Sequence, residues 1–150
     1  MQFSWRRFEE LGSDELYSAL ALRQNILIVE PSSPYLDLDF VDQMADHLLA
    51  RSNGTLIGYA RCHGPLAERA YSSFGRVVVA REHRRAGLGR ELINRVLAHL
   101  AEGYCLDVLI SAQLYLQDFY ADFGFTRDGE PYEDVGVPHV NMRLRLNAPS

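Results

Sequence analysis

A strand followed at once by a helix that opens with two glycines is the feature that most restricts how this chain can fold. Val77–Val79 is β-branched and predicts a strand, while Gly87 and Gly89 introduce a segment that is apolar on one helical face. The apolar positions of that face are Leu88, Leu92, Ile93, Val96, Leu97 and Leu100. Gly103 is expected to end the helix in the left-handed conformation.

The turn between this strand and helix has the properties of an anion site. The first N–H groups of a helix lack partners within it, and the helix dipole adds partial positive charge there. Glycine has no Cβ, so a phosphate group can approach the backbone closely. Four arginines and one glutamate lie between Arg81 and Arg90, in a chain whose net charge is −5. The alternative is a solvated turn whose arginines simply face water.

Two common nucleotide motifs are missing from the turn. No Lys-Ser/Thr pair follows the glycines, as the triphosphate-binding loop requires, and the third glycine of the dinucleotide fingerprint is absent. We therefore expect a phosphate-bearing ligand of another class.

Length and composition predict one globular domain over residues 1–150, with 47% hydrophobic and 23% charged residues. The acidic net charge argues against a nucleic-acid surface, and no apolar run is long enough to span a membrane. Cys62 and Cys105 have no metal-like spacing, so we expect no metal, no disulfide and a reducing, cytoplasmic location.

The remaining elements follow from periodicity and turn residues. Strands are expected over 3–8, 47–51, 55–60, 106–112, 126–132 and 139–146, and helices from Ser13 towards Pro31 and over 114–123. Asn53-Gly54 predicts a hairpin, and Gly124 a left-handed helix cap. Residues 133–138 are expected to form a loop. This order predicts an α/β domain with a mixed sheet.

Residues 30–42 combine acidic and aromatic side chains without regular periodicity. Four carboxylates fall within these thirteen residues, but the spacing does not fit a calcium loop: counted from Asp37, the glycine and glutamate positions hold Asp42 and Leu48. One interpretation is a solvated loop held by hydrophobic anchors at Leu36, Leu38 and Phe40. The other is that the loop forms one wall of a substrate site, where its carboxylates would attract the ammonium group of an acceptor molecule.

Two motifs in the expected order carry a family resemblance. Arg84-Arg85-Ala86-Gly87-Leu88-Gly89 resembles the Gln/Arg-x-x-Gly-x-Gly/Ala signature of the GNAT N-acetyltransferases. Phe119-Tyr120-Ala121-Asp122-Phe123-Gly124-Phe125 is similar to the Phe-Tyr-x-x-x-Gly-Phe pattern that these enzymes carry on the helix after their fifth strand. Arg81 stands where many members have proline, and Arg85 where many have glycine. The resemblance implies a GNAT-type acyltransferase fold, with a mixed central sheet of about seven strands flanked by helices.

The resemblance also implies which residues meet acetyl-CoA. Its pyrophosphate would lie on the glycine turn and its pantetheine arm along the strand. The implied contacts are Val77, Val79, Arg84, Arg85, Ala86, Gly87, Leu88, Gly89, Arg90 and Gln113, the last where many members use asparagine. Tyr120 would give a proton or a hydrogen bond to the departing sulfur. The alternative role for Tyr120 is a packed tyrosine whose hydroxyl finds a backbone partner.

A wider pattern is similar to the ElaA-type branch of the family. It comprises Arg23, Val29-Glu30, Pro34-Tyr35, Asp37, Asp39, Asp42, the segment from Gln113 to Tyr120, and Gly136-Val137-Pro138-His139. Pro31 and Ser33 depart from it, where glutamine and cysteine are usual. The branch implies use of acetyl-CoA but identifies no acceptor.

The expected chemistry needs a base. An amine with a pKa near 10.4 is neutral in about one molecule in 2500 at pH 7, a penalty of about 4.6 kcal/mol. Candidate bases are Glu30, Asp39, Glu133 and His139, of which we take Glu30 as the catalytic partner of Tyr120. Tyr35, Asp37, Asp39 and His139 are expected to contact the acceptor. Neither cysteine has a recognisable histidine or aspartate partner, which argues against an acyl-cysteine route.

The sequence therefore predicts an acetyl-CoA-dependent N-acetyltransferase that modifies a primary amine of a small molecule or peptide in a ternary complex. We expect no nucleic-acid or membrane partner, and a monomer or homodimer. A non-catalytic acyl-CoA-binding module is the rival interpretation. Nucleic-acid binding through Arg81–Arg90 is a third, and it would predict an affinity that falls steeply with salt.

Overall fold

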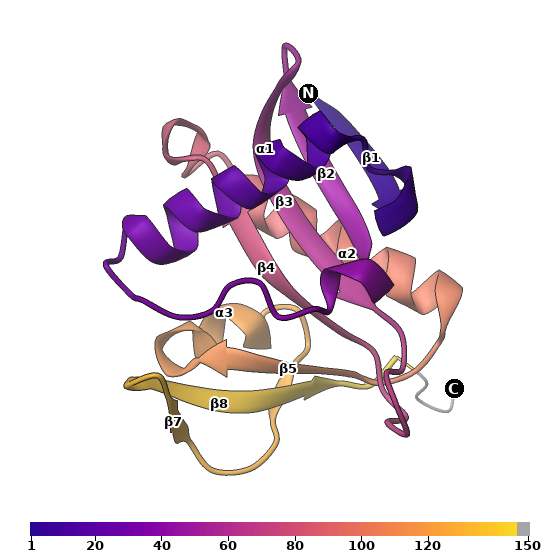
Figure 1. Ribbon diagram of the computed structural model, residues 1–150. Helices are drawn as coiled ribbons and strands as arrows, with labels where there is room; N and C mark the ends of the chain where they lie inside the picture. Colours follow the sequence, from indigo (N-terminus) through magenta and orange to yellow (C-terminus); the bar gives the residue numbers. More distant parts are fainter. Residues whose placement is uncertain (147–150) are drawn as a thin grey trace.

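The computed structural model describes residues 1–146, which form two sheets and three α-helices (Figure 1). The first sheet is antiparallel, with the order β1 (Gln2–Arg7), β2 (Asp46–Ser52), β3 (Thr55–His63) and β4 (Ser73–Val79). The second has the order β5 (Val108–Gln113), β8 (Val137–Leu144) and β6 (Thr126–Arg127), and β7 (Tyr132–Asp134) also pairs with β8. The α-helices are α1 (Ser13–Arg23), α2 (Leu88–Gly103) and α3 (Gln117–Ala121). Short 3₁₀ turns lie at 8–10, 42–44, 81–83 and 114–116, and a π-helical segment, Gln24–Val29, continues α1.

The two sheets join where β4 and β5 begin. Ser72 and Val108 form a parallel bridge, in which Ser72 N donates to Asp107 O at 2.9 Å and Leu109 N donates to Ser72 O at 2.9 Å. Beyond the bridge β4 and β5 diverge as a wedge, and α3 lies beside its open end (Figure 1). The predicted mixed arrangement of about seven strands is confirmed as this split pair of sheets. One edge of β4 is left without a strand partner among the described residues.

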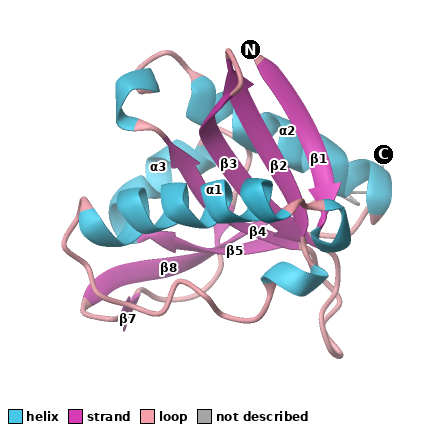
Figure 2. Cartoon of the chain, turned by 45° about the horizontal axis from the view of Figure 1, so that its top comes forward, coloured by secondary structure: helices cyan, strands magenta, loops and turns pink. Residues whose placement is uncertain are grey.

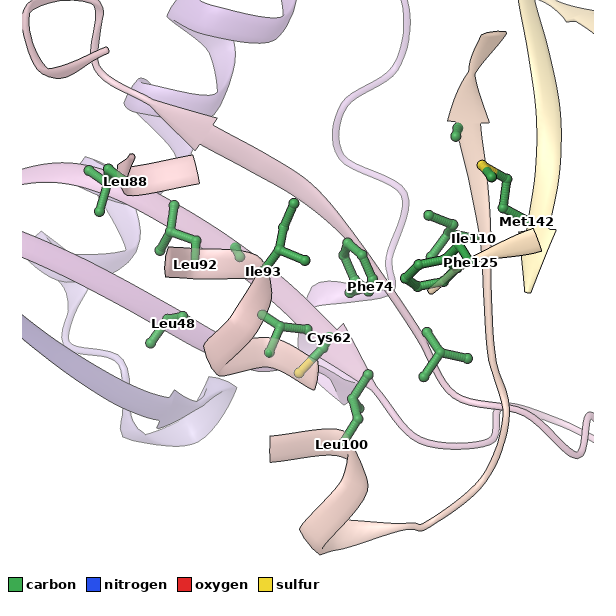
Figure 3. Packing of buried hydrophobic residues seen from close by; sticks show 14 of the residues in the cluster. Leu48, Cys62, Phe74, Leu88, Leu92, Ile93, Leu100, Ile110, Phe125 and Met142 are labelled. Carbon is green, nitrogen blue, oxygen red and sulfur yellow. The ribbon is translucent and has the colours of Figure 1, made fainter. Parts of the chain in front are cut away.

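Helices cover both faces of the first sheet, with α1 on one face and α2 on the other (Figure 2). Strand alternation sends Leu48 towards α2 and Leu49 towards α1, because successive side chains point to opposite faces. The predicted apolar stripe of α2 fills the main core, where Leu88, Leu92, Ile93 and Leu100 pack with Phe74, Ile110, Phe125 and Met142 (Figure 3).

Several sequence predictions about turns are confirmed, and one is wrong. Asn53 and Gly54 both have positive φ at the β2–β3 hairpin, and Gly124 is left-handed after α3. Gly103, however, lies within α2, and the left-handed residue is Cys105, with φ 53°. The amides of Tyr104 and Cys105 both donate to Leu100 O, at 3.0 and 3.2 Å, so the helix closes two residues later than expected.

The C-terminal strands also differ from expectation. The strand expected over 126–132 is interrupted, because Gly129 has φ 104° and Pro131 has no N–H to donate. The residues 133–138, expected as a loop, instead belong to the β7–β8 hairpin, whose Val135 and Gly136 both have positive φ. The helix expected over 114–123 is a 3₁₀ turn followed by α3.

Candidate active site

The glycine turn before α2 is open to solvent and is not blocked by other parts of the protein. Gly87 precedes the helix with φ 83°, a conformation that strongly favours glycine. A Cβ placed on Gly87 or Gly89 would have no neighbour within 4 Å. The side chain of Leu88 is buried in the core, so only its backbone is left for a ligand. The turn therefore exposes helix N-terminal amides to open space, as an anion site requires.

Of the arginines around this turn, some form ion pairs and others do not. Arg84 Nη1 is 2.6 Å from Glu30 Oε1, and Arg90 Nη2 donates to Asp122 Oδ2 at 3.0 Å. Within residues 1–146, Arg81 and Arg85 have no ion-pair partner. Two unpaired guanidinium groups thus add positive charge beside the open amides.

Arg85 itself has φ 65°, which is unusual for a residue with a side chain. This conformation is one that glycine adopts readily, which fits the glycine often found at this place in the signature that the turn resembles. Arg85 is exposed to solvent.

Glu30 lies at the end of the π-helical segment, where its amide donates to Asn25 O at 2.9 Å. The hydrogen bond from Arg84 lowers the pKa of Glu30, so its carboxylate stays ionised and paired. Such a carboxylate is a weak proton acceptor. The geometry suits Glu30 better to holding Arg84 beside the turn than to deprotonating an amine.

Tyr120 lies on α3, at the open end of the wedge between the sheets. Its ring centroid is 6.3 Å from that of Phe74 on β4 and 6.0 Å from that of Phe125. Burial raises the pKa of Tyr120 to about 12. The hydroxyl has no hydrogen-bond partner among the described residues, so it remains free to donate to a ligand.

Val77 and Val79 lie on β4, which pairs with β3 on one side only. Their side chains are half-buried against the main core. The backbone on the unpaired side of β4 faces the wedge, and it can form hydrogen bonds with an extended ligand in the manner of an added strand.

Gln113 and His139 lie directly opposite each other on β5 and β8. His139 Nδ1 is 2.8 Å from Val137 O, and its ring stacks on Tyr132 with centroids 6.1 Å apart. A carbonyl oxygen only accepts, so Nδ1 carries the proton of the neutral ring and Nε2 has a free lone pair. His139 is therefore built as a proton acceptor at Nε2.

A polar cluster on the same sheet was not anticipated. Tyr132 donates its hydroxyl proton to Asn141 Oδ1 at 2.8 Å, and its oxygen also bonds to Ser111 Oγ. The stretch 106–112 looks apolar on both faces in the sequence, yet Ser111 and Gln113 are exposed on one face of β5. Their alternation with the buried Ile110 and Ala112 is the signal that could have revealed this face.

The acidic loop is bound to three arginines, which lie on α1, β3 and β4. Arginines and aspartates alternate around a closed circuit, which we call the arginine–aspartate ring: Arg23, Asp42, Arg61, Asp39, Arg76 and Asp37. Arg23 Nη1 is 2.8 Å from Asp42 Oδ1, and Arg61 Nη1 is 2.9 Å from the same oxygen. Each carboxylate pairs with two guanidinium groups.

The ring is charge-balanced and largely removed from water. Arg23 is only 1% exposed, and Asp42 7%. Burial alone would raise the pKa of Asp42, but hydrogen bonds from Arg23 and Arg61 hold it below its usual range. Burial would likewise raise the pKa of Asp39, yet hydrogen bonds from Arg61 and from the Val41 amide hold it at about 2.

The strand β4 bends to bring Arg76 into the ring. Arg76 has φ 52°, and the β3–β4 register shifts at this point, which marks a bulge. Arg76 Nε is 2.8 Å from Asp37 Oδ1, and its guanidinium lies 5.8 Å from the ring of Tyr35. The signal for this network was an arginine, Arg61, inside the otherwise apolar run of β3.

The interpretation of Leu36, Leu38 and Phe40 as hydrophobic anchors is wrong. These side chains are 87%, 59% and 80% exposed. The chain alternates through this loop, so that Asp37 and Asp39 point inward to the arginines and the apolar neighbours point outward. The loop is held by ion pairs, and its carboxylates are not free to attract a cation.

Comparisons with known proteins agree with this architecture. A family model described as an acetyltransferase (GNAT) domain matches residues 22–146. A UPF0039 protein of Synechocystis sp. is 38% identical over 148 residues, which cover 97% of this chain and 96% of that protein. Protein ElaA of Escherichia coli K12 is 35% identical over 136 residues, 89% of each chain.

Solved structures agree with the sequence relatives. An acyl-CoA N-acyltransferase from Pseudomonas aeruginosa superposes with a TM-score of 0.91 at 32% identity, covering 95% of this chain and 98% of that one. Escherichia coli ElaA superposes with a TM-score of 0.89 at 32% identity and the same coverage. None of the described helices is long and apolar enough to cross a membrane. The chain therefore belongs to the ElaA-like branch of the GNAT family, whose members are acyltransferases that use an acyl-CoA cosubstrate.

Proposed function

We propose that this protein transfers an acetyl group from acetyl-CoA directly to a primary amine of a small molecule or peptide within a ternary complex. The observation that carries the proposal is the open glycine turn at the start of α2, because Gly87 and Gly89 leave free space at a helix N-terminus flanked by unpaired arginines. The unpaired edge of β4 leads from this turn into the wedge that holds Tyr120.

The residues present fit the proposed cosubstrate. The turn amides, with Arg81 and Arg85, suit a pyrophosphate, and the free edge of β4 suits the amides of a pantetheine arm. Phe74, Tyr120 and Phe125 pack together in the wedge, which supports a short acyl chain over a long one. When bound, acetyl-CoA supplies an acyl group already activated as a thioester.

Tyr120 would donate a hydrogen bond and keep its proton. A pKa of about 12 at Tyr120 compares with about 8.5 for a free thiol, so complete proton transfer to the sulfur would be uphill by about 5 kcal/mol. This free-energy cost is larger than the cost for an unperturbed tyrosine, whose pKa is about 10. A hydrogen bond from the hydroxyl still stabilises negative charge as it develops, and that effect is largest in a buried site.

His139 is the base that the geometry favours for the acceptor amine. Its Nε2 lone pair is free, because Nδ1 donates to Val137 O. Glu30 is paired with Arg84, and Asp39 with Arg61 and Arg76. We assign to Nε2 the task of accepting the ammonium proton, directly or through one water, and to Glu30 the task of positioning Arg84.

The same contacts change the roles proposed for the acceptor wall. Asp37 and Asp39 belong to the arginine–aspartate ring, so we assign them to shaping the loop rather than to binding an ammonium group directly. Tyr35, beside Arg76, stays a proposed acceptor contact, as does Gln113 for the cosubstrate.

The test is release of CoA from acetyl-CoA in the presence of a panel of polyamines, amino acids and amine-bearing metabolites. With an acceptor found, Tyr120→Phe should lower kcat about 10- to 100-fold with little change in KM, as loss of a hydrogen bond to a charged group predicts. His139→Gln should lower kcat about 100-fold and remove the limb of the pH–rate profile that reports the base. Tyr115→Phe is the matched control, because Tyr115 is an exposed tyrosine on the preceding turn.

Three outcomes would contradict the proposal or a part of it. Tight CoA binding without turnover on any amine would favour the non-catalytic module. Full activity of Tyr120→Phe would remove the tyrosine from the mechanism. If the arginine turn instead retained DNA with a steep salt dependence and did not bind CoA, the nucleic-acid interpretation would replace it.

A further inference from the structure

A second constellation of polar side chains lies away from the glycine turn, at the other end of α2. Asp46 opens β2, Cys62 lies near the end of β3, and His99 is on α2. Asp46 and Cys62 face each other in the β2–β3 register. One donor atom from each of the three side chains lies within 4.8 Å of the other two.

We propose that Asp46, Cys62 and His99 form a zinc-class metal site, with a water as fourth ligand. A thiolate, an imidazole and a carboxylate are the donors that Zn²⁺ takes in proteins, whereas Mg²⁺ and Ca²⁺ prefer oxygen alone. Cys62 is fully buried, but the side chains of Asp46 and His99 are 26% and 32% exposed. The site therefore has a dry side and an open side, which leaves a coordination position facing solvent.

Packing holds two of the donors in place before any metal binds. The His99 ring stacks on Trp5, with centroids 3.8 Å apart and planes 12° apart. Cys62 lies in the main core close to Leu100 of α2 (Figure 3). A preorganised donor set loses little side-chain entropy on coordination, which favours affinity.

Coordination requires a small rearrangement and a defined loss of protons. His99 Nε2 is now 2.9 Å from Asp46 Oδ2, so Nε2 carries a proton that the carboxylate accepts. On binding, the neutral imidazole moves that proton to Nδ1, and Cys62 Sγ releases its proton to water. Both donors then present a lone pair to the metal, and the three donor atoms settle about 3.5 Å apart.

The site is separate from the proposed acyl-transfer chemistry. His99 follows Leu88 by eleven positions in α2, or about 16 Å along the helix from the glycine turn. A metal here would tie β2, β3 and α2 together and would act on stability. No local sequence pattern predicts this site, because its three donors come from different elements, β2, β3 and α2.

The experiment is a titration of the full chain with Zn²⁺ against a chromophoric chelator, together with Co²⁺ absorption. We expect one Zn²⁺ per chain with a Kd of about 1 μM or tighter, and a thiolate-to-Co²⁺ charge-transfer band. Cys62→Ala should abolish the band, and His99→Gln should weaken Zn²⁺ binding by more than about 100-fold, since even outer-shell groups contribute about 10- to 100-fold. Cys105→Ala is the matched control, because Cys105 is an exposed cysteine in the same region.

The proposal is overturned if Zn²⁺ binds no tighter than about 100 μM, or if Cys62→Ala and His99→Gln both leave its affinity unchanged. A band that disappears in Cys105→Ala instead of Cys62→Ala would also overturn it. Should Cys62→Ala fold poorly, His99→Gln still decides the question, because the His99 side chain is partly exposed and its loss leaves the core intact.

Discussion

The glycine turn and the acidic loop are both short, charged and irregular stretches, but they differ in whether their charged side chains are paired. At the turn, Arg81 and Arg85 have no ion-pair partner among the described residues, and the neighbouring amides face open space. In the loop over residues 30–42, Asp37, Asp39 and Asp42 are each paired with two guanidinium groups. Charge that remains unpaired is available to a ligand, whereas charge that is paired and buried holds the chain in place.

This difference explains why one stretch was interpreted correctly as a structural feature and the other was not. The turn is specified by adjacent residues: a β-branched strand, a left-handed Gly87 and an amphipathic helix. The loop depends on arginines on three other elements, which are far away in the sequence. A local pattern of carboxylates carries no information about those partners.

The largest effect is expected at the centre of the arginine–aspartate ring. Asp42→Asn keeps the shape of the side chain but removes the charge that faces both Arg23 and Arg61. Removing one partner from a buried ion pair leaves uncompensated charge, so the free energy of unfolding should fall by about 3–5 kcal/mol. Urea denaturation at neutral pH measures this change.

Asp134→Asn is the matched control for the ring. Asp134 is exposed on β7 and has no ion pair within residues 1–146, so its replacement should change stability by less than about 0.5 kcal/mol. A loss below about 1 kcal/mol for Asp42→Asn would mean that the ring behaves like a set of surface pairs. The contrast between loop and turn would then disappear.

The next effect is on binding rather than stability. Gly89→Glu puts bulk and negative charge where the phosphate of CoA would lie, so affinity for CoA should fall at least about 100-fold, or about 2.7 kcal/mol. Folding should be preserved, because a Cβ at Gly89 meets nothing and an acidic residue suits the first turn of a helix. Calorimetric titration with CoA and thermal unfolding report the two quantities separately.

Gly103→Glu makes the same substitution at the other end of the same helix. Gly103 also has open space around it, and it lies far from the proposed phosphate position. CoA affinity should stay at the level of the unmodified protein in this variant. Equal affinity for CoA in Gly89→Glu and in the unmodified protein would count against the turn as a phosphate site.

The fold was predictable from the sequence wherever adjacent residues determine the conformation. The apolar stripe of α2, the Asn53-Gly54 hairpin and the left-handed Gly124 are all confirmed. The failures have non-local causes. The end of α2 at Cys105 instead of Gly103 depends on which backbone amides reach Leu100 O. The bulge at Arg76 places this side chain beside Asp37, in a loop more than thirty residues earlier.

The candidate site divides in the same way. The conformation of the glycine turn and the position of Tyr120 on a helix were predictable, because each lies in a compact local motif. The free lone pair of His139 depends on a hydrogen bond to Val137 and on a hairpin that was expected to be a loop. The pairing of Glu30 with Arg84 joins residues 54 positions apart. No local pattern could have ranked these two candidate bases.

The smallest effect separates the two interpretations of the loop most cleanly. Phe40 is 80% exposed and has φ 63°, a conformation that asparagine tolerates better than phenylalanine. Phe40→Asn should therefore change the free energy of unfolding by no more than about 0.5 kcal/mol, in either direction. An anchoring phenylalanine would instead cost about 3–5 kcal/mol when truncated. Urea denaturation of Phe40→Asn and Asp42→Asn therefore shows which side chains hold the loop. Similar losses in the free energy of unfolding would favour apolar anchoring. A large loss for Asp42→Asn alone would show that the ion pairs hold the loop.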